Sequence, residues 1–305
     1  MSSLQERLNR LQTVPDDLVE AMSKVEREAM GRVLALMDQL EVVDGNITNS
    51  SKNLSLIKTI EDDLRTALFN NSYYKAVNGF GKEFEVQAGL TNEYFSSILD
   101  DFEVIGRYKT VLQTSQANAL SLLSQDVFTQ TLIKPIQDSL LASVTNNGSF
   151  QETLANLRKT ILGNDEIEGR LLSHVKRIAY DSFAIANRQY TQTIATNLKF
   201  EWYLYTGGVV SDSRCFCIER HGKYYHINEI RAWGRGEHIG VCGQYNKTLS
   251  RTGWQGMNLD TTEITIMVLV GGYQCKHDIL PVAKRSVPKK VIEKAIDDGF
   301  YKEAA

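Results

Sequence analysis

Hydrophobic residues spaced three and four apart dominate the first two thirds of the chain and predict helices. The longest stripe begins after Thr13 and Pro15, and Asp44-Gly45 stops it. Its members are Leu18, Met22, Val25, Ala29, Val33, Leu36, Leu40 and Val43. Thr13 is a suitable N-cap and Pro15 suits a first helical turn, so we expect a helix of about 44 Å that starts there.

A first helix of this length is typical of an arm that docks on another protein. The candidate docking residues are Leu18, Met22, Val25, Val33, Leu36 and Leu40. The alternative is a long core helix of a bundle that this chain builds by itself. The spacing does not distinguish these two hypotheses, because both need one apolar face.

Further helices are predicted up to about Leu198. The segment 46–53 is polar and predicts a loop, the next helical run breaks at 70–72, and short helices with turns are expected between Tyr73 and Gly89. A run from Tyr108 to Val144 contains Pro135, which should end or kink it.

A stronger helix start follows at Ser149. Ser149 and Glu152 form a capping-box pattern, in which each side chain satisfies a free backbone N–H of the other residue. We therefore expect helices from Ser149 to about residue 198.

The periodicity changes to that of strands near residue 199. Phe200, Trp202 and Leu204 alternate with Glu201 and Tyr203 up to Gly207-Gly208, and 264–270 is a second β-rich run. The expected fold class is α+β, with a long, mostly helical N-terminal region followed by a small α+β C-terminal domain. The domains expected are a helical arm or bundle over 1–148, a domain over 149–285 (helices over 149–198, then the α+β part over 199–285) and a tail over 286–305.

Composition and charge narrow the classes of partner. The 305 residues are 42% hydrophobic and 23% charged, which is typical of globular proteins, and the net charge is −3. Residues 1–199 carry 20 Lys and Arg against 25 Asp and Glu, whereas 200–305 carry 14 against 12. Any contact with nucleic acid must therefore be local. The polar start and the lack of a run of about 18 apolar residues predict synthesis in the cytoplasm and no membrane partner.

All four cysteines and four of the five histidines lie between residues 200 and 280. The possible zinc ligands are Cys215, Cys217, Cys275 and His277. One residue between paired ligands is a poor spacing for a structural zinc site, so we expect ordinary thiols first, then metal, then a disulfide, and no obligatory zinc or other cofactor. The same residue types are those of a Cys/His hydrolase, but no nucleophile turn accompanies them.

Basic residues gather in the glycine-rich part of the same region. This part of the chain holds seven basic residues but only three acidic ones, Glu219, Glu229 and Glu237, and aromatic residues lie among the basic ones. The basic residues are Arg214, Arg220, Lys223, Arg231, Arg235, Lys247 and Arg251. Such a mixture favours contact with a nucleic-acid backbone without sequence preference, and a solvated loop is the alternative.

Several short motifs follow one another in a characteristic order within residues 149–285. They are Arg177-Ile178-Ala179, Ala186-Asn187, Trp202, Asp212 with Arg214 and Cys215, His221-Gly222-Lys223, and Cys275-Lys276-His277 running to Leu280-Pro281-Val282. This order resembles the phage head morphogenesis family, the minor head proteins of tailed phages often called Mu F-like. The family more often has Cys-x-x-Cys at 215–217 and Arg at Lys276, and the segment 227–260 has no clear equivalent.

The resemblance implies a non-enzymatic minor head (capsid) protein of the virion that is made in the host cytoplasm. It would act in head assembly and DNA packaging near the portal vertex. Its expected partners are the portal protein, the major capsid protein or both, and double-stranded DNA without sequence preference. The alternatives are a Cys/His-dependent hydrolase or toxin-like transferase, and a zinc-stabilised nucleic-acid-binding module. Within the domain, Asp212 and Arg214 are expected to pair at the end of a strand.

Overall fold

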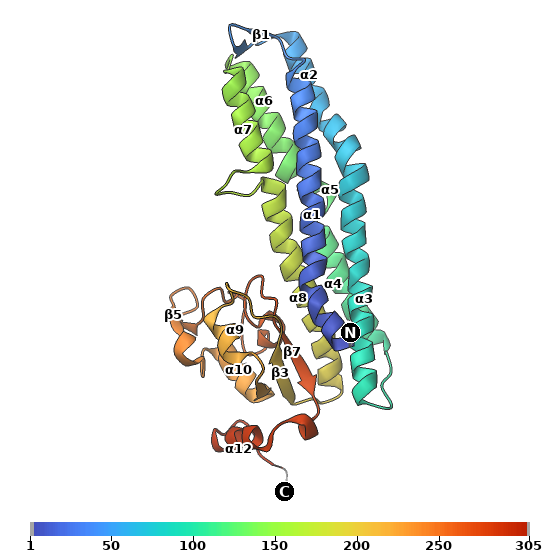
Figure 1. The fold of residues 1–305 in the computed structure, drawn as a ribbon, viewed down its shortest axis with the longest axis vertical. Helices are drawn as coiled ribbons and strands as arrows, with labels where there is room; N and C mark the ends of the chain where they lie inside the picture. Colours follow the sequence, from blue (N-terminus) through green and yellow to red (C-terminus); the bar gives the residue numbers. More distant parts are fainter. Residues whose placement is uncertain (1–2, 304–305) are drawn as a thin grey trace. The chain divides into compact units, whose positions relative to one another are not determined.

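The computed structural model describes residues 3–303, which divide into two compact units (Figure 1). One unit, here called the helical unit, comprises 13–83 and 117–179; the other, the mixed unit, comprises 1–12, 84–116 and 180–305. The expected α+β class is confirmed. The division does not follow the expected boundary at 148, because it falls inside continuous helices rather than in linkers.

The helical unit is built from four main helical segments and one hairpin. Helix α1 (Ser3–Met37) supplies its longest segment, and α2 (Ser51–Leu64), α6 (Lys134–Thr145) and α7 (Phe150–Leu162) pack beside it. Helices α3 (Tyr74–Ile98) and α8 (Arg170–Asn197) begin in this unit. Ser149 is the N-cap of α7 and accepts a hydrogen bond from the backbone N–H of Glu152, as the capping box predicts.

The expected docking stripe on α1 belongs to the core of this chain. Met22 and Val33 have no exposed surface, and Leu18, Val25 and Leu40 are also buried, while Leu36 is half-buried. The docking hypothesis is therefore wrong for these residues, and the alternative of a long core helix holds. An amphipathic stripe reports that an apolar face is covered, and it carries no information on whose side chains cover it.

Helix α1 also starts ten residues earlier than expected. Thr13 and Pro15 lie inside it, because the buried face continues upstream through Val14, Leu11 and Arg7 at helical spacing. An arginine on that face hides the pattern from a search for apolar residues. At the other end, Asp44 and Gly45 both have positive φ and form the two-residue turn between β1 (Val42–Val43) and β2 (Asn46–Ile47).

Two expected breaks are absent, and Pro135 does not end its helix. The polar segment 70–72 lies in a π-helical stretch (Arg65–Tyr73) that joins α2 directly to α3, and no turn interrupts 73–89. Pro135 follows a second π-helical stretch (Thr129–Ile133), so the helix runs on from α5 (Gln125–Phe128) into α6. A wider turn can accommodate a proline without a break. The aromatic contact of Tyr73 with Phe128, at 4.5 Å between ring centres, joins these two π-helical regions.

The mixed unit contains the three-stranded antiparallel sheet β4-β3-β7. The predicted first strand is confirmed as β3 (Trp202–Thr206), which pairs with β4 (Tyr224–His226) and β7 (Asp278–Val282). The predicted strand at 264–270 is wrong. This segment contains the short helix α11 (Ile266–Leu269). Ile266, Met267 and the following Val270 are buried, and Ile264, which precedes the helix, is exposed. A burial pattern with gaps of one, three and four residues fits a helical turn better than a strand.

The remaining elements of the mixed unit surround this sheet. They are α4 (Gly106–Ser121, shared with the helical unit), α9 (Cys215–Arg220), α10 (Ile227–Arg235), the 3-10 turns Gly240–Cys242 and Lys284–Ser286, the hairpin β5 (Gln244–Asn246) and β6 (Arg251–Gly253), and α12 (Lys289–Asp297). Within residues 3–303, no helix combines the length and the apolar composition needed to cross a membrane.

A buried carboxylate in the helical unit makes stability depend on pH. Glu26 is 2% exposed, and its carboxylate accepts a 2.8 Å hydrogen bond from the backbone N–H of Leu172 in the first turn of α8. Burial raises the pKa of Glu26 to about 7, although the hydrogen bond from Leu172 opposes this shift. A Cβ on Gly169 would lie 2.4 Å from a carboxylate oxygen of Glu26, so glycine is required there.

We expect Glu26→Gln to flatten the pH dependence of the unfolding free energy. The pKa of Glu26 rises from 4.5 in the unfolded chain to about 7 in the folded one, so between these values the folded chain keeps a proton that the unfolded chain releases. Stability from this group is thus present below pH 4.5 and is lost as the pH rises through 7, by up to about 3 kcal/mol. Urea titrations at pH 5 and pH 8 measure the unfolding free energy at each pH, and their difference gives the pH dependence. The exposed Asp63→Asn on α2 is the control, and equal slopes for wild type and Glu26→Gln would contradict the assignment.

Candidate functional site

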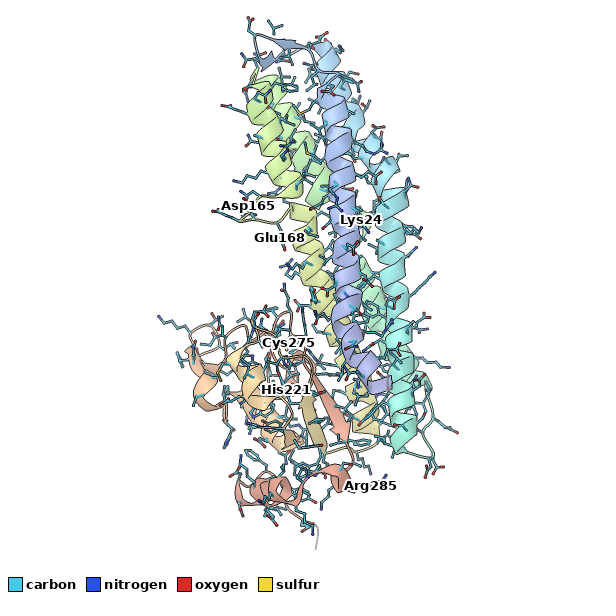
Figure 2. The ribbon with its side chains drawn as sticks, viewed as in Figure 1. Lys24, Asp165, Glu168, His221, Cys275 and Arg285 are labelled. Carbon is cyan, nitrogen blue, oxygen red and sulfur yellow. A yellow bond between two sulfur atoms is a disulfide. The ribbon has the colours of Figure 1, made fainter. Side chains whose placement is uncertain are left out.

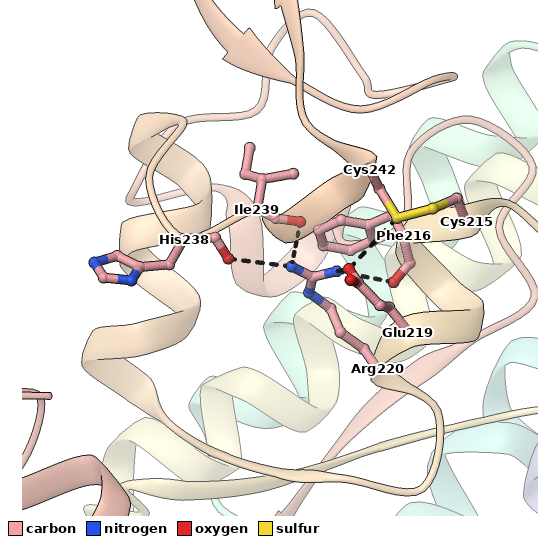
Figure 3. Close-up of a disulfide and its surroundings, with 7 residues drawn as sticks. All are labelled: Cys215, Phe216, Glu219, Arg220, His238, Ile239 and Cys242. Atoms are coloured by element: carbon pink, nitrogen blue, oxygen red, sulfur yellow. Dashed lines mark hydrogen bonds and ion pairs between the residues drawn. A yellow bond between two sulfur atoms is a disulfide. The ribbon is translucent and has the colours of Figure 1, made fainter.

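The four cysteines separate into a bridged pair and a buried pair. Cys215, at the start of α9, forms a disulfide with Cys242, which lies 27 residues further along the chain (Figure 3). Cys217 and Cys275 are buried free cysteines. The expectation that thiols or metal would come before any disulfide is therefore wrong for Cys215 and Cys242. Their contact depends on how α10 and the turn after it return to α9, which local spacing does not report.

Cys217 and Cys275 form a compact cluster with His277. The Sγ atoms of the two cysteines lie 3.7 Å apart, and Sγ of Cys275 lies 3.7 Å from Nδ1 of His277. One ligand atom from each of the three residues lies within 4.8 Å of the other two. The side chains are 1%, 5% and 3% exposed, in the order Cys217, Cys275 and His277. Of the four zinc candidates from the sequence, the fold thus brings three together and assigns Cys215 to the disulfide.

Backbone geometry fixes the segment Cys275-Lys276-His277 that leads into β7. Arg188 of α8 is buried and donates hydrogen bonds to the carbonyls of Cys275 (2.8 Å), His277 (2.6 Å) and Val268 (3.0 Å). Gly271 has φ of +78°, and a Cβ there would lie 2.1 Å from Sγ of Cys275. The cluster is therefore held by a buried guanidinium and by a glycine that no larger residue can replace without displacing the sulfur.

The electrostatics of the cluster favour one thiolate and one thiol. The hydrogen bond from Cys217 lowers the pKa of Cys275 well below its usual value, and the contact with His277 acts in the same direction against the effect of burial. The hydrogen bond to Cys275 and burial raise the pKa of Cys217. The hydroxyl of Tyr205 in β3 donates to Sγ of Cys217 at 3.1 Å, and burial raises the pKa of this tyrosine. Such an arrangement can stabilise a negative sulfur, either as a nucleophile or as a metal ligand.

A buried polar network lies directly beside the cluster, at Asp278. The guanidinium of Arg7 in α1 pairs with the carboxylate of Asp278 at 2.7 Å, and both side chains are completely buried. Arg7 also donates to Thr191 (2.8 Å) and Asn187 (3.3 Å) of α8. Asn187 in turn donates to Asp278 at 3.0 Å and accepts from Gln87 of α3 at 3.0 Å. Three helices and a strand of the mixed unit thus converge on one ion pair.

Asn187 is one of the residues that carry the family resemblance, whereas no sequence-based expectation included Arg7, Asp278 or Arg188. The sequence contains a signal for two of them. Arg7 lies four residues before Leu11 on the apolar face of α1, and Asp278 directly precedes the hydrophobic run 279–282. A charged residue at an apolar position indicates a buried pair, but its partner cannot be read from the sequence.

Four of the seven candidate nucleic-acid residues make contacts within the fold. Arg220 is 5% exposed, donates to the carbonyls of Phe216, His238 and Ile239, and lies 3.9 Å from the ring centre of Phe216 (Figure 3). Arg251 donates to the carbonyl of Thr261. Arg235 is exposed but pairs with Glu237 at 2.9 Å and with Glu263 at 3.0 Å.

Arg214 donates to the carbonyls of Gly271 (3.2 Å) and Tyr273 (2.6 Å), and not to Asp212 as expected. Asp212 itself is exposed. Among the described residues, Lys223, Arg231 and Lys247 are the three candidates that are exposed and whose side chains form no hydrogen bond or ion pair. The basic region is therefore largely structural, and only these three positions can meet phosphates without breaking internal contacts.

The aromatic residues of the segment 227–260 are mostly core residues. Trp233 and Trp254 are buried, and the ring of Trp254 stacks on Phe216 at 4.0 Å between centres. Tyr245 is 67% exposed. The role of this segment is thus to complete the core beside α9 and to supply Cys242, and its tryptophans are not available to stack on bases.

Comparisons with protein-family models, with curated proteins and with solved structures found no match for this chain. The resemblance to the phage head family remains a prediction from the motifs.

We expect the Arg7–Asp278 pair to dominate the stability of the mixed unit. Arg7→Met leaves the carboxylate of Asp278 buried without its cation, and loss of one partner of such a pair costs about 3–5 kcal/mol. The double variant Arg7→Met/Asp278→Leu should lose less than the sum of the single variants. Denaturant titration followed by tryptophan fluorescence measures this, because all three tryptophans lie in this unit.

Lys24→Met is the matched control for the ion pair. Lys24 lies on the same helix and pairs with Glu20 at 2.7 Å, but both side chains are mostly exposed. Its loss should change stability by less than about 1 kcal/mol. Equal effects of Arg7→Met and Lys24→Met would contradict the dominant role of the buried pair.

Proposed function

We propose that the chain is a non-enzymatic minor head protein of a tailed phage, which acts in head assembly beside the portal. The observation that carries this proposal is the ordered series of motifs between Arg177 and Val282. Its support in the fold is that motif residues distant in sequence are brought together in the mixed unit. Asn187 hydrogen-bonds Asp278, Arg188 holds the segment that contains Cys275 and His277, and Trp202 pairs with Val282 in the sheet.

The rival function is a Cys/His-dependent hydrolase, and a specific observation favours it. Cys275 and His277 lie in contact, and the pKa of the cysteine is lowered. However, both side chains are at least nine-tenths buried, so a substrate could not reach the sulfur without opening the fold. A nucleophile has to be accessible to the bond that it attacks, and this arrangement fits a structural role better.

Contact with the partner must use a surface other than the α1 stripe. Two loop residues of the mixed unit are unusually exposed for their type, since Val241 is 90% and Ile264 is 82% exposed. Singly exposed apolar residues are common on protein surfaces, and a contiguous exposed apolar patch is what marks an interface. We propose that the contact with the portal or capsid protein lies on the mixed unit, and these two residues are the positions at which it is tested first.

The proposal predicts that this protein occurs in purified phage heads. Mass spectrometry of particles should detect it in fewer copies than the major capsid protein, and deletion of its gene should reduce the yield of filled heads. The double variant Val241→Asp/Ile264→Asp should enter heads at least about tenfold less, which corresponds to about 1.4 kcal/mol of lost binding.

Leu141→Asp, at an exposed position of the helical unit, is the matched control and should enter heads normally. Thermal denaturation must show that both variants remain folded. Complete absence of the protein from particles, together with normal heads after deletion, would contradict the proposed function. Normal entry of the Val241→Asp/Ile264→Asp variant would contradict only the assigned surface.

We further propose weak contact with double-stranded DNA through Lys223, Arg231 and Lys247. Three phosphates neutralised give a slope of log affinity against log salt of about −2.7, so binding at 200 mM salt should be about 40-fold weaker than at 50 mM. Lys223→Glu/Lys247→Glu should weaken binding equally for two unrelated duplexes, because phosphate contacts carry no base information. Filter binding measures both quantities.

The control for DNA binding is Arg158→Glu/Lys159→Glu, which changes the charge equally at two exposed positions of the helical unit. An equal loss in both double variants would indicate a general charge effect and exclude the three residues as the contact. A strong preference for one duplex would contradict contact through phosphates alone and would favour instead the alternative of a zinc-stabilised nucleic-acid-binding module.

A further inference from the structure

We propose that Cys217, Cys275 and His277 bind one zinc ion within the mixed unit. The spacing of these residues in the sequence disfavours such a site only if both members of each pair, Cys-x-Cys and Cys-x-His, bind the same ion. The fold takes one ligand from the first pair and two from the second. This inference is independent of the proposed head function, since it depends only on the geometry of the cluster.

The distances within the cluster match the edges of a zinc tetrahedron. Zinc–sulfur bonds of about 2.3 Å and zinc–nitrogen bonds of about 2.0 Å place two sulfur ligands about 3.8 Å apart, and a sulfur and a nitrogen about 3.5 Å apart. The observed separations are 3.7 Å between the two Sγ atoms and 3.7 Å between Sγ of Cys275 and Nδ1 of His277. Two of the three separations therefore match a tetrahedral site, and the third, between Cys217 and His277, lies within 4.8 Å and has to shorten toward about 3.5 Å when an ion binds.

The donor atoms select the class of metal. Two sulfurs and an imidazole nitrogen suit zinc and other thiophilic ions, whereas calcium and magnesium require oxygen ligands. The nearest carboxylate along the chain, Asp278, is held by Arg7. Nε2 of His277 is buried and has no hydrogen-bond partner among the described residues, so no protein group fixes the imidazole in a competing role.

The surroundings hold the ligands in place before any metal binds. Arg188 fixes the carbonyls on both sides of Lys276, and Gly271 leaves the space that Sγ of Cys275 occupies. A second imidazole lies next to the cluster, since the ring of His221 is 6.0 Å from that of His277 (Figure 2 labels His221 and Cys275). Three protein ligands leave the fourth position to this imidazole or to water.

The rival state of the cluster is a second disulfide between Cys217 and Cys275. A sulfur–sulfur separation of 3.7 Å is far from the bonded distance of about 2.05 Å, so the two sulfurs are arranged as separate ligands. Cys215 and Cys242 are already bridged and cannot compete for the metal. The fold thus divides its four cysteines into a covalent pair and a ligand pair.

Metal analysis of the full chain tests the site directly. Protein purified without chelator should contain about one zinc per chain, and replacement by Co²⁺ should give the visible absorption and thiolate charge-transfer bands of tetrahedral cobalt with sulfur ligands. Cys275→Ser and His277→Gln should each lower the bound zinc at least tenfold. Cys215→Ser/Cys242→Ser is the matched control, because it removes two cysteines and the disulfide but should retain the zinc.

Two results would overturn the proposal. One is wild-type protein that binds neither zinc nor Co²⁺ although thiol titration shows Cys217 and Cys275 to be reduced. The other is full zinc retention in both Cys275→Ser and His277→Gln. A second disulfide, detected by mass spectrometry of freshly purified protein that has not been reduced, would also contradict the proposal. If the variants fail to fold, the Co²⁺ spectrum of the wild-type chain decides the question, because it needs no substitution.

Discussion

The completely buried ion pair between Arg7 and Asp278 is the constraint on which the mixed unit depends. Neither charge reaches water, so each is stable there only because the other is present and because Thr191, Asn187 and Gln87 complete the network. The pair joins the first turns of the chain to its last strand, 271 residues apart. A charge pair of this kind stabilises one arrangement of its elements far more than any other, since a shift in register leaves a bare charge in the core.

The Cys-His cluster depends on that constraint through its position in the chain. His277 directly precedes Asp278, so the same β7 register that buries the carboxylate also presents the imidazole to Cys275. Arg188 adds a second restraint one residue after Asn187 on α8, with three backbone carbonyls as its acceptors. Two neighbouring residues of one helix thus connect the polar network with the cluster. This is the physical reason for motif residues from distant parts of the chain to form one site.

The segment between α9 and β7 shows how residue types can mislead about function. A basic, aromatic and glycine-rich composition is typical of nucleic-acid contact, but here most of these residues build the interior. The guanidinium of Arg220 packs against the rings of Phe216 and Trp233, with its N–H groups directed to backbone carbonyls. Arginine suits this role because its flat cation stacks on rings and its several donors satisfy carbonyls that no strand or helix pairs. Composition alone cannot separate this role from phosphate binding.

Local interactions made several features readable from the sequence by itself. The N-cap at Ser149 and the strand that begins at Trp202 depend on neighbours within a few residues, and the structure has both. Asp44-Gly45 predicts the end of the first helix, but that helix ends at Met37, and Asp44-Gly45 forms a hairpin turn instead. The long α1 stripe predicted a helix for the same reason, and Arg7 on the buried face hid its true start.

Only the tertiary structure decided what covers the α1 stripe, which cysteines pair and which cations are free. Cys217 meets Cys275 across 58 residues, and Arg7 meets Asp278 across most of the chain. Such contacts depend on how helices and strands pack, and a residue's type and local spacing are the same whether its partner is a carbonyl, a metal, another cysteine or a second protein. The sequence therefore determined the elements and supplied the reactive residues, and packing determined which of them stand together.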